Sequence, residues 1–159
     1  MKSLHELSER EVLALAIANE EEDSRIYQSF ADRLRPDFDA SAGIFEDMAE
    51  EEREHRDSLY QLYRERFGAH LPPIRREDVR GFLRRRTPWW EPSLDLDKMR
   101  GEAELMERQA ANFYERSAER ATDLAVRQLF THLAEIERSH EKRAEAITNA
   151  HLTADTAAA

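Results

Sequence analysis

The sequence predicts an all-α protein, a four-helix bundle made of two helical hairpins that a long crossover joins. Only four Gly and five Pro occur among 159 residues, and 36% of the residues are charged. So few helix breakers among many Ala, Leu, Glu and Arg residues are typical of long helices. Apolar residues recur with the helical period in four stretches, and the second pair of stretches repeats the pattern of the first.

The first hairpin is expected to contain helices over about 9–34 and 41–67. Ser8 and Glu11 have the spacing of a capping box, in which each side chain accepts a hydrogen bond from the other's backbone N–H. Pro36 ends the first helix because it lacks an N–H. Gly68 suits the C-terminal cap of the second helix.

Residues 69–94 are predicted to form the crossover. A helix of roughly 27 residues is about 40 Å long, so a chain that returns to begin a parallel helix needs a long connection. A short helix is expected over 77–86. Two Arg clusters, Arg75–Arg76 and Arg84–Arg86, are expected to pair with acidic helices of the chain or of a dimer mate, and Trp89–Trp90 to pack over the bundle. Contact with a membrane surface is the alternative.

The second hairpin is expected to contain helices over about 95–121 and 123–150, with Thr122 and Asp123 as the cap of the latter. Residues 8–150 thus form one predicted domain, and 151–159 form a tail without a stop signal.

A short sequence motif of the second predicted helix recurs in the fourth. At one constant offset, Phe45, Ala49, Glu50, Glu52, Arg53 and His55 reappear as Phe130, Ala134, Glu135, Glu137, Arg138 and His140. Both copies end in Glu-x-x-His. A Glu and a His three residues apart lie on the same helix face, so both can reach a single metal ion.

A second repeat precedes each copy. Glu20, Tyr27, Ala31 and Arg33 recur at one offset as Glu107, Tyr114, Ala118 and Arg120. Di-iron and di-manganese carboxylate bundles have this ligand arrangement: two helices contribute one Glu each, and the other two each contribute a Glu-x-x-His pair. The predicted metal ligands are therefore Glu20, Glu52, His55, Glu107, Glu137 and His140.

Charge balance supports two metal ions at these positions. Buried carboxylates without partners cost several kcal/mol, whereas two divalent cations would neutralise four of them. Glu52 and Glu137 are placed to bridge the ions. Oxygen and nitrogen ligands suit iron or manganese, and zinc would also bind. Two iron ions are the first choice, and oxidation of Fe(II) by O2 or H2O2 is the proposed reaction.

Several neighbouring residues carry weaker predictions. Glu104 is a candidate extra ligand, while Tyr27 and Tyr114 either orient ligands or only pack in the core. The other histidines, His5, His70, His132 and His151, are expected at the surface. A solvated acidic face is expected at Glu21, Glu22, Asp23, Glu50, Glu51 and Glu54.

Composition excludes several classes of function. The net charge of −10 argues against nucleic acid as a partner. The absence of Cys excludes disulfides, iron–sulfur clusters and a cysteine nucleophile. No signal peptide and no long apolar run are recognisable, so an intracellular protein is expected.

These motifs resemble the rubrerythrin branch of the ferritin-like superfamily over residues 8–150, and more closely the N-terminal erythrin domain of bacterial membrane-bound ferritin A proteins. The resemblance implies a di-iron domain that serves iron export, detoxification and peroxide resistance. It also implies a homodimer on the cytoplasmic side of the inner membrane, tethered through a C-terminal membrane iron-transporter domain beyond residues 151–159.

Two departures from the rubrerythrin pattern bear on activity. Rubrerythrin peroxidases have a rubredoxin module with cysteine ligands, which this chain lacks, and an extra carboxylate where this chain has Ala110. Alternatives to ferroxidation are a metal-sensing module without catalysis, an NADH-coupled peroxidase and a manganese catalase.

Overall fold

The structure, a computed structural model, describes residues 1–82 and 94–157, with side chains up to residue 144. This part of the chain contains no β-strand and only one isolated β-bridge, between Lys2 and Val79. Four long helices form two hairpins, so the predicted all-α, ferritin-like four-helix fold is confirmed. The chain divides into two compact units, Met1–Pro92 and Ser93–Ala159, with one hairpin in each.

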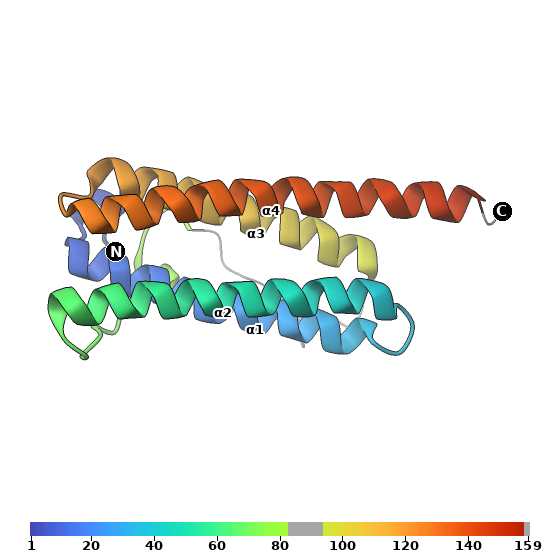
Figure 1. The fold of residues 1–159 in the computed structure, drawn as a ribbon, viewed down its shortest axis with the longest axis horizontal. Coiled ribbons are helices and arrows are strands. Elements are labelled where there is room, and N and C mark those ends of the chain that lie inside the picture. Colours follow the sequence, from blue (N-terminus) through green and yellow to red (C-terminus); the bar gives the residue numbers. More distant parts are fainter. Residues whose placement is uncertain (83–93, 158–159) are drawn as a thin grey trace. The chain divides into compact units, whose positions relative to one another are not determined.

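The first unit contains α1 (Glu9–Leu34) and α2 (Asp39–Phe67), which lie side by side in Figure 1 after a short 3-10 turn, η1 (Leu4–Glu6). The predicted capping box is present, because Ser8 Oγ accepts the Glu11 N–H at 3.1 Å and Glu11 Oε1 accepts the Ser8 N–H at 3.2 Å. α2 ends at Gly68, whose φ of 83° is a conformation that glycine adopts without steric cost.

Aromatic rings fill the core between α1 and α2. Tyr27 stacks on Phe45 with ring centroids 6.1 Å apart, and Phe30 meets Phe45 edge-on at 5.4 Å. Leu13 and Leu59 of the same two helices are also fully buried. Burial of this apolar surface supplies the main driving force for pairing the two helices.

The chain after α2 lies against α1. Tyr63 Oη donates to the carbonyl oxygen of His70 at 2.6 Å, and Arg10 Nε donates to Tyr63 Oη at 2.8 Å. A 3-10 turn, η2 (Arg76–Asp78), follows. The helix predicted over 77–86 is wrong in its described part, because the turn ends at Asp78 and Gly81 has a φ of 94°.

The remainder of the predicted crossover, with Arg84–Arg86, Trp89 and Trp90, lies outside the described residues. The alternatives for these side chains stay predictions.

The second unit contains α3 (Leu96–Arg120) and α4 (Leu124–Ala157), paired as a hairpin. Asp95 caps α3 by accepting the Lys98 N–H at 2.9 Å, and Asp123 caps α4 by accepting the N–H groups of Ala125 and Val126. α4 continues beyond the predicted end near residue 150, since no Gly or Pro follows to stop it.

Candidate metal centre

The first unit brings together three of the predicted ligands. Glu20 lies on α1, while Glu52 and His55 lie one turn apart on α2, and their exposed fractions are only 2%, 2% and 8%. One ligand atom from each lies within 4.8 Å of the others. His55 Nδ1 is 3.7 Å from Glu20 Oε2 and 3.8 Å from Glu52 Oε2. We call these residues the first triplet.

The second unit repeats this arrangement with Glu107 on α3 and Glu137 and His140 on α4. Their exposed fractions are 1%, 1% and 6%, and one ligand atom from each again lies within 4.8 Å of the others. His140 Nδ1 is 3.5 Å from Glu107 Oε2 and 3.8 Å from Glu137 Oε2. This second triplet shows that the sequence repeat is also a repeat of local geometry.

The spacing within each triplet suits a cation. Two ligand atoms that each lie about 2.1 Å from one ion are at most about 4.2 Å apart, and the His–Glu distances of 3.5–3.8 Å are within that limit. Two carboxylates and one imidazole match the preferences of iron and manganese, and of zinc. Each triplet could therefore hold a divalent metal ion.

The electrostatics of the first triplet also favour a cation. Burial by itself would lower the pKa of His55, but the carboxylates of Glu20 and Glu52 outweigh burial and raise that pKa from 6.5 to about 10. In the metal-free chain a proton on His55 thus compensates part of the buried negative charge. A metal ion would take over that role and release the proton.

The two candidate tyrosines pack in the cores of their hairpins. Tyr27 and Tyr114 are each 1% exposed, and Tyr114 contacts the rings of Phe113 and Phe130 at centroid distances of 5.2 and 5.8 Å. Each tyrosine therefore packs in the core of its own unit. The alternative, that the hydroxyl groups orient metal ligands, stays a prediction.

Glu104, the candidate extra ligand, lies outside both triplets. Its Oε1 accepts from Arg108 Nη2 at 2.7 Å, and its side chain is 37% exposed. Of the histidines predicted at the surface, His5, His70 and His132 are exposed, and the side chain of His151 lies outside the described part.

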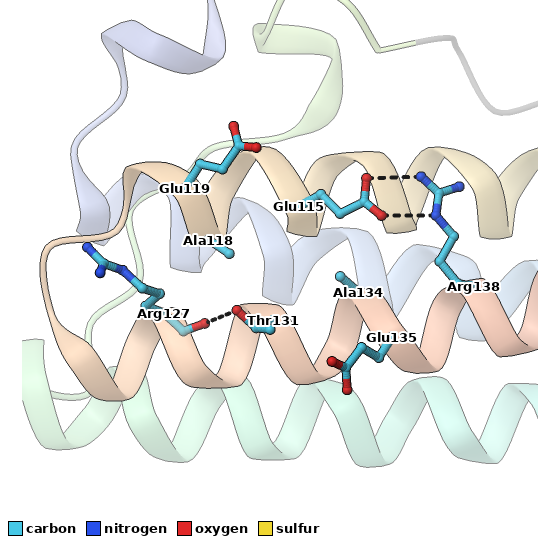
Figure 2. Close-up of a pocket in the computed structure, with 8 residues that line it drawn as sticks. All are labelled: Glu115, Ala118, Glu119, Arg127, Thr131, Ala134, Glu135 and Arg138. Atoms are coloured by element: carbon cyan, nitrogen blue, oxygen red, sulfur yellow. Dashed lines mark hydrogen bonds and ion pairs between the residues drawn. The ribbon is translucent and has the colours of Figure 1, made fainter.

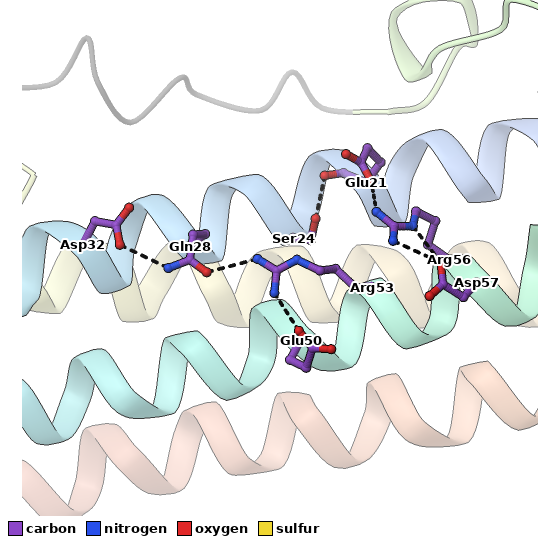
Figure 3. A network of polar contacts seen from close by, with 8 residues as sticks. All are labelled: Glu21, Ser24, Gln28, Asp32, Glu50, Arg53, Arg56 and Asp57. Carbon is purple, nitrogen blue, oxygen red and sulfur yellow. Dashed lines mark hydrogen bonds and ion pairs between the residues drawn. The ribbon is translucent and has the colours of Figure 1, made fainter.

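Outward-facing arginines next to the bridging candidates link the helices of each hairpin. Arg53 follows Glu52 and donates to Gln28 of α1 at 3.0 Å, within a network that also contains Arg56 and Glu21 (Figure 3). In the second unit Arg138 follows Glu137 and makes two 3.0 Å bonds to Glu115 of α3, at the edge of a surface pocket (Figure 2).

A buried ion pair of the first unit departs from the prediction. Asp23, assigned to a solvated acidic face, is 5% exposed and accepts from Arg76 at 3.1 Å. The ion pair with Arg76 of the crossover segment offsets the desolvation cost of burying the Asp23 carboxylate. For Arg76, pairing with an acidic helix of the same chain is confirmed. For Arg84–Arg86 it stays a prediction. The helical period alone did not reveal this contact, because the period contains no information about the crossover.

Comparisons with known proteins agree with this geometry. The rubrerythrin family profile matches residues 11–148. A solved structure, a hypothetical protein from Pyrococcus furiosus, is similar over 94% of both chains with a TM-score of 0.75 and 24% identity, which supports the fold. No curated protein gives a significant match. Among the described residues, no helix is long and apolar enough to cross a membrane.

Proposed function

Because the chain belongs to the rubrerythrin family, we propose that its two triplets together supply the six ligands of one di-iron centre. The observation that carries this proposal is the duplication of a buried Glu/Glu/His triplet, once in each hairpin. Four carboxylates would balance the charge of two divalent ions. Manganese or zinc would be substitutes for iron.

The proposed reaction is oxidation of Fe(II), the substrate, by O2 or H2O2. A pair of Fe(II) ions supplies two electrons, one from each ion. The protein's part is to bind and orient: Glu52 and Glu137 would bridge the ions, Glu20 and His55 would complete one, and Glu107 and His140 the other. Burial of all six side chains keeps bulk water away from the site. His55 would give up its proton when the ion binds.

A metal-sensing role without catalysis is the second candidate. Each triplet joins two helices of one hairpin, so an ion would tie these helices together and could change what a partner recognises. Sustained peroxidase turnover is a weaker candidate, because the chain has no cysteine ligands for an internal electron relay.

The wider setting is also a proposal. Family resemblance suggests a homodimer, tethered through a C-terminal transporter domain to the cytoplasmic side of the inner membrane, that serves iron export and peroxide resistance.

The decisive experiment is an anaerobic Fe(II) titration of the metal-free protein, followed by exposure to O2 or H2O2 while the near-ultraviolet absorbance is recorded. Saturation at two irons per chain with an absorbance rise on oxidation is expected. Glu52→Ala and Glu137→Ala should lose both, whereas the exposed controls Glu54→Ala and Glu135→Ala should retain them. Tight binding without oxidation would favour sensing, and no binding would reject the di-iron centre.

A further inference from the structure

Among the described residues of the crossover segment, Arg76 has the most buried charged side chain. Its side chain is 2% exposed, although the chain here is only a 3-10 turn between two extended residues. The turn is held in place: Asp78 accepts the Arg75 N–H at 2.9 Å, and the N–H of Arg80 donates to the carbonyl oxygen of Lys2 at 2.9 Å. The backbone therefore presents Arg76 to α1 from a fixed position.

The contacts of Arg76 surround Glu20 along α1. Its Nε donates to Asn19 Oδ1 at 3.2 Å and lies 2.8 Å from Glu22 Oε2. Its Nη2 donates to Asp23 Oδ1 at 3.1 Å and to the carbonyl oxygen of Asn19 at 3.4 Å. One guanidinium thus holds Asn19, immediately before Glu20, and Glu22 and Asp23, two and three residues after it. A planar group with several donors restrains both rotation and translation of that turn.

Two of the three side chains that accept from Arg76 have no polar counterpart in the second unit. At the offset that relates Glu20 to Glu107, the positions of Asn19, Glu22 and Asp23 are occupied by Met106, Gln109 and Ala110. Two of these residues have no polar side chain that could accept from a guanidinium. The internal repeat therefore does not extend to the residues that contact Arg76, next to Glu20 of the first triplet.

We infer that Arg76 is a positioning residue of the metal centre, which fixes the turn of α1 that carries Glu20 and so orders the first triplet but not the second. This inference rests on the proposed function. Arg76 acts through Asn19, Glu22 and Asp23, which flank Glu20 in the chain. The two metal positions then differ, because only the first depends on the crossover.

The test uses the full chain and Co(II) as a spectroscopic probe. Arg76→Met should weaken Co(II) binding at one of two sites by about 10-fold to 100-fold, the usual effect of losing a residue that orients a ligand. The other site should keep its affinity. Arg75→Met, the exposed neighbour, is the matched control and should change neither site.

A double variant separates positioning from stability. Arg76→Met removes the Arg76 guanidinium from the buried Asp23 carboxylate. Arg76→Met with Asp23→Leu replaces the ion pair by apolar side chains and should recover the melting temperature. If Arg76 positions Glu20, the double variant still binds Co(II) weakly at one site. Wild-type affinity at both sites in this variant, or equal weakening at both, would overturn the inference.

Hydrogen exchange of the metal-free protein gives a readout that needs no metal. The amides of residues 19–24 should exchange faster in both Arg76 variants, while those of the corresponding turn of α3, residues 106–111, should not change. If the wild-type chain binds no Co(II), the proposed function fails, and unchanged exchange at 19–24 would separately reject the positioning role of Arg76.

Discussion

Nδ1 of His140 lies 3.5 Å from Oε2 of Glu107 on the neighbouring helix of its hairpin, and His55 has the same relation to Glu20 at 3.7 Å. Each pair depends on the axial register of two helices. A slip of one residue turns a side chain by about 100° and would separate the pair. The register of each hairpin is therefore a property on which metal binding should depend.

Replacement of either histidine should remove one metal ion. We expect His55→Ala and His140→Ala each to bind one Co(II) per chain tightly, since each substitution removes the only imidazole of one triplet. Equilibrium dialysis followed by metal analysis measures the stoichiometry. His132→Ala, exposed on α4, is the control. Two ions bound tightly to both variants would contradict the ligand assignment.

The raised pKa of His55 predicts a pH dependence of stability in the metal-free protein. A pKa that folding raises from 6.5 to about 10 means that the protonated form stabilises the folded state. This contribution is fully present below about pH 6.5 and is lost as the pH rises through about 10. The difference in melting temperature between the wild type and His55→Gln should therefore shrink over this range.

The pH series is recorded with a chelator, because a bound ion would replace the proton. A difference in melting temperature that stays constant up to about pH 10 would show that His55 is not protonated in the folded chain.

The outward-facing arginine of the second unit should matter much less than Arg76. Arg138 and Glu115 are 37% and 48% exposed, so water screens their ion pair. We expect Arg138→Gln to lower the free energy of unfolding by about 1 kcal/mol or less, and less still in high salt. Loss of the buried Arg76 pair should cost about 3–5 kcal/mol. Urea unfolding of both variants measures the contrast, and equal effects would contradict it.

The capping box at the start of α1 gives a prediction independent of metal. Ser8→Ala removes the acceptor of the Glu11 N–H and should lower the free energy of unfolding by about 1 kcal/mol. Ser8→Asp keeps an acceptor and should restore most of that stability in thermal unfolding. Failure of Asp to restore it would show that the cap contributes little.

Most of the helical framework could be predicted because its signals are local. The Ser8–Glu11 box, Pro36, Gly68 and Asp123 each act on the backbone within a few residues, and the structure has the corresponding helix ends near them. The early start of α2 had no such signal, since Phe38 makes no side-chain cap. The continuation of α4 likewise reflects the absence of a stop rather than a signal.

The members of the two triplets could be predicted from sequence, because helical periodicity places Glu52 with His55, and Glu137 with His140, on one face, and the repeat supplies the same pattern twice. Tertiary structure alone decided which residues surround Glu20. Arg76 reaches Asn19 and Asp23 only after the chain beyond α2 folds back along α1. Contacts between residues so distant in sequence depend on the path of an irregular segment, and no periodic pattern encodes that path.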